Sequence, residues 1–95
     1  MPHFAVRYTY DLRADARDHF RTEHRAYLAG LADGGALLGS GPFSTGAAGA
    51  LIVLRARDEE HVKEMLDADP FQREGLVAET EVRVWEIVLG PWSEA

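Results

Sequence analysis

His24 is the side chain in this sequence best suited to proton transfer. It lies four residues after Phe20 and four before Leu28, which places an imidazole on the apolar stripe of a predicted helix. Histidine side chains titrate near neutral pH and serve as general acids or bases. A buried histidine can equally be a core residue satisfied by one hydrogen bond, and the spacing leaves both interpretations open.

Asp69 is the candidate partner of His24. It lies with Asp67 at the predicted C-terminal end of a second helix, where the helix dipole disfavours a negative charge by about 0.3 to 1 kcal/mol. A carboxylate bonded to one ring nitrogen of His24 would fix the tautomer and make the other nitrogen a better base. The alternative is that Asp69 only begins an Asp-Pro turn with Pro70, and sequence spacing does not decide between them.

Other patterns that could carry chemistry are weaker. The segment of residues 39–46 offers hydroxyls and backbone amides, but no Gly-Lys-Ser/Thr follows, so we expect a hairpin connection rather than a phosphate-binding loop. Nothing around Ser40 or Ser44 resembles a nucleophile elbow. The remaining histidines lack the i, i+4 spacing of a helical metal site, and there are no cysteines. We therefore expect no metal centre and no disulfide.

The periodicity of the chain predicts the elements that position these residues. Apolar and polar side chains alternate over His3–Tyr10, which predicts a strand. A long amphipathic helix follows, capped at its start by Asp11 and ended by the glycines at 34 and 35. Residues 36–40 and 50–55 are predicted strands joined by a Gly/Pro/Ser loop, so they form a hairpin.

The second half of the chain repeats a helix and a strand. Asp58 caps a helix that Pro70 ends, residues 71–75 form a connecting turn, and the last strand covers about 80–89. The order is strand, helix, strand, strand, helix, strand. This βαββαβ order predicts an α+β, ferredoxin-like fold, with an antiparallel four-stranded sheet and two helices on one face. The outer strands are rich in apolar residues, so we expect a homodimer that packs sheet to sheet or closes into a dimeric α/β barrel.

Length and charge exclude several classes of protein. With 95 residues and 10.5 kDa, we expect residues 1–95 to form a single domain. A net charge of −6 repels phosphate backbones and anionic lipids, so nucleic acid and membrane are not expected partners. There is no apolar run of about 20 residues and no signal peptide, which predicts a cytoplasmic protein.

The chain resembles the YCII-related (YciI-like) family in an ordered set of short motifs. These are Arg21-x-x-His24-x-x-Tyr27-Leu28, then Leu37-Leu38 and Gly41-Pro42, then Asp69-Pro70-Phe71 and Gly75. The similarity spans nearly the whole chain. It implies a ferredoxin-like protomer in a dimeric α/β barrel, with His24 and Asp69 as an active-site pair in a pocket. Family members with an assigned reaction include dehydrochlorinase-type lyases that act on ring compounds.

Together the residues and the resemblance favour a small cofactor-independent enzyme, a lyase or isomerase acting on a small organic molecule. His24 is the expected general acid/base and Asp69 orients it. Arg21 is the candidate for binding an anionic group, although a surface salt bridge would also suit its position. The other expected pocket residues are Ser40, Gly41, Pro42 and Phe71. The rival hypothesis is a non-catalytic small-molecule-binding or interaction module in which the His24–Asp69 pair is structural.

Overall fold

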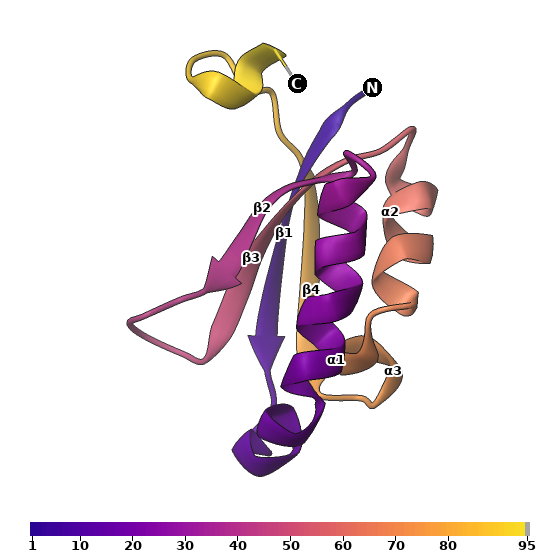
Figure 1. Ribbon diagram of the computed structural model, residues 1–95. Helices are drawn as coiled ribbons and strands as arrows, with labels where there is room; N and C mark the ends of the chain where they lie inside the picture. The colour runs from indigo at the N-terminus through magenta and orange to yellow at the C-terminus, as the bar shows by residue number, and fades with distance from the viewer. Residues whose placement is uncertain (95) are drawn as a thin grey trace.

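The computed structural model describes residues 1–94 and contains four strands, three α-helices and a C-terminal 3₁₀ helix (Figure 1). In chain order these are β1 (His3–Tyr10), α1 (Ala14–Asp33), β2 (Leu37–Pro42), β3 (Gly49–Arg55), α2 (Glu59–Asp67), α3 (Pro70–Arg73), β4 (Val77–Val84) and η1 (Pro91–Glu94).

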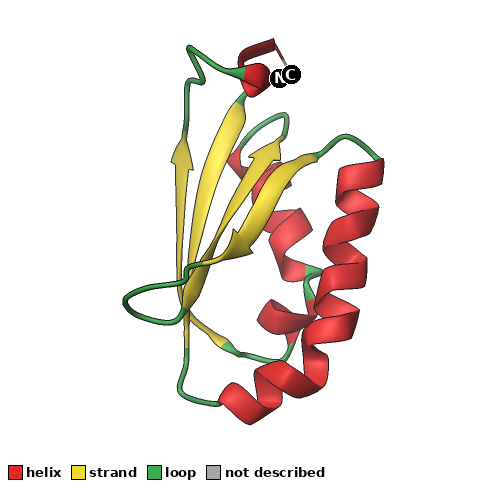
Figure 2. Ribbon diagram, turned by 60° about the vertical axis from the view of Figure 1, so that its left-hand side comes forward, coloured by secondary structure: helices red, strands yellow, loops and turns green. Residues whose placement is uncertain are grey.

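The strands form one antiparallel sheet in the order β2-β3-β1-β4. All three α-helices lie on the same face of this sheet, and the opposite face is left open (Figure 2). The chain reverses between α1 and β2 at Gly35, whose φ of 86° lies in the left-handed region that favours glycine. The ferredoxin-like arrangement predicted from the order of elements is therefore confirmed.

The core lies between the sheet and the helices. Alternate residues of β1, namely Phe4, Val6 and Tyr8, face the helices and are at most 2% exposed. Side chains from β3, α1 and α2 complete this layer: Ala50, Ile52, Leu54, Leu28, Val62, Met65 and Leu66. Burial of these apolar side chains fixes α1 against the strands that carry the candidate site.

The open face of the sheet is more polar than the sequence suggested. Arg7 of β1 pairs with Glu81 of β4 at 3.5 Å, and Glu79 and Arg83 share that face through the cross-strand register. On this face of β3 Leu51 is 41% exposed, whereas Val53 is buried. Further exposed apolar side chains lie at the end of β4, at Val84, and in residues 85–92 that follow it.

Several predicted boundaries were wrong. Asp11 does not cap α1, because its carboxylate accepts from the backbone of Arg13 in the turn that precedes the helix. The second helix ends before Pro70, and this proline begins α3 where a connecting turn was expected over 71–75. The predicted strand over 80–89 is displaced, since β4 is Val77–Val84, and just beyond its end the backbone N–H of Trp85 donates to the backbone oxygen of His3 at 2.9 Å. The strand predicted over 36–40 is β2, which is shifted toward Pro42.

The helices within residues 1–94 include none that is both long enough and apolar enough to cross a lipid bilayer.

Candidate functional site

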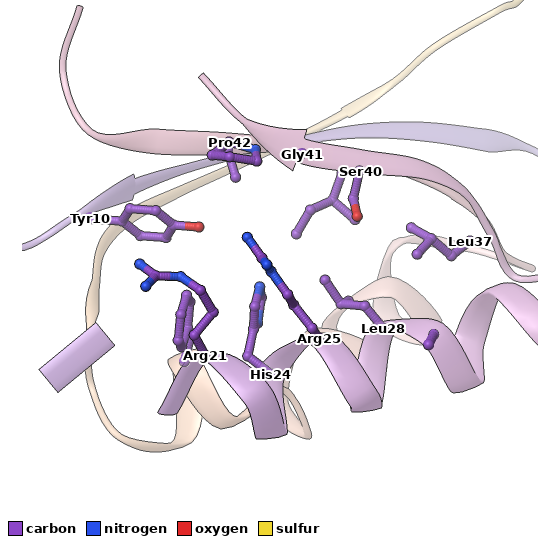
Figure 3. Close-up of a pocket in the computed structure, with 13 residues that line it drawn as sticks. Tyr10, Arg21, His24, Arg25, Leu28, Leu37, Ser40, Gly41 and Pro42 are labelled. Atoms are coloured by element: carbon purple, nitrogen blue, oxygen red, sulfur yellow. The ribbon is translucent and has the colours of Figure 1, made fainter. Parts of the chain in front are cut away.

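A cavity of about 770 Å³ lies between α1 and the β2–β3–β1 part of the sheet (Figure 3). The apolar part of its wall comes from both layers and consists of Leu28, Ala29, Leu37, Pro42, Ala50, Ile52 and Phe71. The polar part consists of Tyr10, Arg21, His24, Arg25, Ser40 and the backbone of Gly41. Acidic side chains are absent from this wall in the described part of the chain.

His24 projects from α1 into this cavity (Figure 3). Only 7% of the residue is exposed, and its Nδ1 lies 2.6 Å from Oδ1 of Asp69. Nε2 has no hydrogen-bond partner within residues 1–94, so it is the ring nitrogen available to a molecule in the cavity. This geometry presents one nitrogen to a ligand while a carboxylate holds the other.

Asp69 is fully buried behind His24 and serves two parts of the structure at once. As the N-cap of α3 its Oδ1 accepts from the backbone N–H of Phe71 at 3.1 Å, and the same oxygen contacts His24. Its Oδ2 accepts from the hydroxyl of Tyr8 at 2.9 Å. The two interpretations of Asp69, histidine partner and Asp-Pro turn residue, therefore hold together in one side chain.

These contacts assign the tautomer of His24. The carboxylate of Asp69 only accepts hydrogen bonds, so Nδ1 of His24 must carry the hydrogen that it donates to Oδ1. Nε2 then has a free lone pair and can accept a proton. Burial, and next the negative charge of Asp69, raise the pKa of the Tyr8 hydroxyl above its usual range. Tyr8 consequently stays protonated and remains a donor to Asp69.

Aromatic packing fixes the plane of the imidazole. The ring of Phe71 stacks on the ring of His24 with centroids 3.8 Å apart and planes 2° from parallel. Tyr10 packs edge-on against Phe71 at 5.6 Å. Because Phe71 is only 2% exposed, it holds His24 from within the core as well as contributing to the cavity wall.

Three arginines of α1, at positions 17, 21 and 25, lie on the side of the helix that faces Tyr10. The guanidinium of Arg17 lies 4.9 Å from the centre of the Tyr10 ring and donates to the backbone oxygen of Asp11. Burial, followed by the charge of Asp69, raises the pKa of Tyr10, and the positive charges of the three arginines oppose this. Arg21 both lines the cavity and pairs with Asp18, so the two roles considered for it coexist.

The structure brings the predicted site residues together. Six of them line the cavity, namely Arg21, His24, Ser40, Gly41, Pro42 and Phe71, and Asp69 lies directly behind His24. Sequence reasoning did not identify Tyr8, Tyr10, Arg17 and Arg25. The two tyrosines share the strand period of Phe4 and Val6, so the sequence did not separate them from core residues; the structure shows the bond of Tyr8 to Asp69 and the place of Tyr10 in the cavity wall. Within residues 1–94, no three His, Asp or Glu side chains are grouped closely enough to hold a metal ion.

Solved structures with the same fold include enzymes. The 5-chloro-2-hydroxyhydroquinone dehydrochlorinase TftG from Burkholderia phenoliruptrix, solved in complex with 2,5-dihydroxybenzoquinone, is 25% identical, with a TM-score of 0.76 over 87% of this chain and 92% of its own. The cofactor-independent oxygenase SnoaB from Streptomyces nogalater is 12% identical, with a TM-score of 0.53 over 95% of each chain.

A third structure, Rv0793 from Mycobacterium tuberculosis, is 14% identical, with a TM-score of 0.54 over 94% of this chain and 96% of its own. At 12% and 14% identity, the likeness to SnoaB and to Rv0793 shows that this chain has the same fold as those proteins. No curated protein has a detectably similar sequence. Residues 1–86 match the YCII-related domain, and the chain therefore belongs to the YCII-related family.

Proposed function

We propose that the protein is a small enzyme, a lyase or isomerase, in which His24 transfers a proton to and from a small organic molecule. The observation that carries the proposal is the 2.6 Å contact between Nδ1 of His24 and Oδ1 of Asp69, on a histidine whose other nitrogen faces the cavity. The cavity, at about 770 Å³, has the size of a site for one small molecule. No group outside the chain is required for this chemistry.

The proposed step is general base catalysis. Nε2 of His24 takes a proton from the substrate, and the electron pair of the broken bond forms a new double bond. In an elimination the leaving group departs with its own electron pair, and His24 then releases the proton to water. In an isomerisation the imidazolium returns the proton to a different atom of the substrate. In both cases the carboxylate of Asp69 stabilises the imidazolium, and Phe71 keeps its plane fixed.

The likeness to TftG supports a lyase that acts on ring compounds, because its identity of 25% extends over 87% of this chain. The first substrate to test is therefore 5-chloro-2-hydroxyhydroquinone, the compound for which TftG is named. The experiment measures chloride release from 5-chloro-2-hydroxyhydroquinone by the wild type, by His24→Gln and by His19→Gln, a control on an exposed position of the same helix. Removal of a general base should lower kcat about 10²- to 10⁴-fold in His24→Gln only.

Two results would each remove part of the proposal. Absence of chloride release by the wild type would exclude the dehydrochlorinase reaction. Equal rates in the wild type and a folded His24→Gln variant would exclude His24 as the base. Circular dichroism and thermal unfolding of each variant establish that a lost activity is not a lost fold.

A non-catalytic binding module is the second candidate. It is favoured by the two further hydrogen bonds that Asp69 accepts, from Phe71 and from Tyr8, because they give this buried carboxylate a structural role without any reaction. In that case His24→Gln would lower the melting temperature, 2,5-dihydroxybenzoquinone would bind the wild type, and no chloride would be released.

A homodimer is part of the proposal. It is supported by the uncovered sheet face, by Leu51 at 41% exposure on that face, and by the exposed apolar side chains that follow β4. Sedimentation equilibrium should give twice the chain mass for the wild type and a lower mass for Leu51→Glu. A wild type that sediments as a monomer would exclude this part of the proposal without affecting the chemistry assigned to His24.

A further inference from the structure

Arg25 is the residue next to His24, and it lines the same cavity (Figure 3). Positions 17, 21 and 25 are spaced by four, so one side of α1 carries three guanidinium groups in succession. The charges of all three act on the hydroxyl of Tyr10, which also lines the cavity. The chain has a net charge of −6, and yet within residues 1–94 the cavity wall contains two arginines, Arg21 and Arg25, and no acidic side chain.

The three arginines differ in how far their charge is already compensated. Arg17 is 9% exposed and is held by Asp11, and Arg21 is paired with Asp18. Arg25 has no ion pair and no side-chain hydrogen bond within residues 1–94. Three other arginines share this condition in the described part of the chain, Arg55, Arg57 and Arg83, but none of them lines the cavity. The charge available to a ligand in the cavity is therefore that of Arg25.

The apolar part of the cavity wall indicates that the ligand also has an apolar part. Leu28, Leu37 and Ile52 are buried apolar side chains from both layers, and they give the cavity an apolar wall that a hydrocarbon ring can pack against. Arg25 is solvent-exposed at the edge of the cavity, and a guanidinium group binds a two-oxygen anion through two parallel hydrogen bonds.

We propose that Arg25 binds the anionic group of the ligand and that the ligand is a small ring-bearing organic anion. This inference rests on the proposed function for the location of the ligand, and it adds the substrate class. A carboxylate on the ring and an ionised ring hydroxyl both offer Arg25 an oxygen that carries a delocalised negative charge. The test distinguishes these two sources of charge.

Binding is measured by isothermal titration calorimetry without turnover. The probes are benzoate, its neutral analogue benzamide, and 2,5-dihydroxybenzoquinone, whose ring hydroxyls ionise readily. The variants are Arg25→Gln, Arg25→Lys and the control Arg57→Gln, which removes the same charge from an exposed arginine outside the cavity. Arg25→Lys keeps the charge and loses the planar fork.

We expect the wild type to bind at least one of the two anions at least tenfold more tightly than benzamide. Arg25→Gln should remove that preference and leave benzamide binding unchanged, Arg25→Lys should retain part of it, and Arg57→Gln should behave as the wild type. Loss of affinity for benzoate assigns a carboxylate, and loss for 2,5-dihydroxybenzoquinone alone assigns a ring oxygen. Equal binding of anions and benzamide by the wild type, or a preference unchanged in Arg25→Gln, would overturn the inference.

The outcome is separable from that of the catalytic proposal. If Arg25→Gln loses the anion preference while His24→Gln still releases chloride at the wild-type rate, the anion site stands and the role of His24 as base falls. If His24→Gln is inactive while Arg25→Gln binds all probes as the wild type does, the reverse holds.

Discussion

The hydroxyl of Tyr8 donates a hydrogen bond to Oδ2 of Asp69 across 2.9 Å, while Nδ1 of His24 lies 2.6 Å from Oδ1 of the same carboxylate. Strand β1, helix α1 and the start of α3 thus meet at one buried side chain. The orientation of His24 depends on all three elements, because each contributes one of the donors that hold Asp69. A substitution of Tyr8 should therefore alter the orientation of His24, although Tyr8 itself does not line the cavity.

Removal of the Tyr8 hydroxyl tests this relationship. Tyr8→Phe deletes a hydrogen bond to a charged group, so the free energy of unfolding should fall by about 1.5 to 3 kcal/mol. Urea denaturation measures this fall. In the chloride-release assay kcat should fall while KM stays constant, because Tyr8 acts through Asp69 and does not line the cavity.

Tyr27→Phe is the matched control for Tyr8→Phe. Its hydroxyl donates to the backbone oxygen of Met65 at 2.7 Å and has no bond to Asp69. This variant should lose stability but keep the wild-type kcat. If the two variants had the same kcat, Tyr8 would have no positioning role beyond its contribution to the fold.

Stability at alkaline pH should depend on Tyr8. Its pKa is raised in the folded protein by burial and by the charge of Asp69, so above a pH of about 10 the native state keeps a proton that the unfolded chain has lost. The contribution of Tyr8 to the free energy of unfolding is complete below that pH. As the pH rises further, the free energy of unfolding falls by about 1.4 kcal/mol per pH unit for each such tyrosine.

Tyr10 and Tyr27, whose pKa values are also raised mainly by burial, add to the alkaline loss of stability. Urea denaturation between pH 9 and 11 should therefore show a shallower dependence in Tyr8→Phe than in the wild type. Identical slopes for the two proteins would contradict the assignment of a retained proton to Tyr8.

A double-mutant cycle measures the coupling between His24 and Asp69. His24→Gln and Asp69→Asn should each destabilise the protein, and together they should destabilise it by less than the sum, with an interaction energy of about 0.5 to 3 kcal/mol. The same cycle with the exposed pair Lys63 and Asp67, joined at 2.8 Å, should give about 0.3 to 0.5 kcal/mol. Additive effects at His24 and Asp69 would mean that their contact contributes nothing to stability.

Two glycine substitutions should have opposite effects on stability. At Gly49 a Cβ atom would lie 2.2 Å from the backbone oxygen of Tyr8, so Gly49→Ala must push β3 away from β1 and should cost about 2 kcal/mol or more. At Gly30 in α1 nothing lies within 4 Å of an added Cβ atom, and Gly30→Ala should stabilise the helix by about 0.5 to 1 kcal/mol. Thermal unfolding measures both, and melting temperatures that shifted in the same direction would contradict the prediction.

The sequence was sufficient for the framework because its apolar periods are strong. The alternation over β1 and the stripe through His24 and Leu28 come from burial on one face, which a residue pattern records directly. The end of β4 could not be found in this way. Residues 85–89 continue the strand-like composition of Val82 and Val84, but β1 begins at His3, whose backbone oxygen takes the last hydrogen bond of this pairing, from Trp85.

The candidate site was predictable only in part. His24 stood out because an ionisable residue interrupts an apolar stripe, and Asp69 because of its place before a proline. The contribution of Tyr8 depends on its hydrogen bond to Asp69, which lies 61 residues away in the sequence. The contribution of Arg25 depends on the absence of an acidic side chain next to it in the described part of the chain. The contact of Tyr8 is not local in sequence, and the place of Arg25 in the cavity wall depends on how α1 packs on the sheet, so no residue pattern could reveal either.

Trp92 in η1 lies so close to β2 that a Cβ atom added to Gly39 would come within 2.8 Å of its indole ring. Gly39 immediately precedes Ser40, Gly41 and Pro42, which line the cavity. A ligand that moves this strand changes the surroundings of an indole whose emission depends on polarity. The chain thus carries its own fluorescent reporter for occupancy of the cavity, and Trp85→Phe would leave Trp92 as the only tryptophan in the emission.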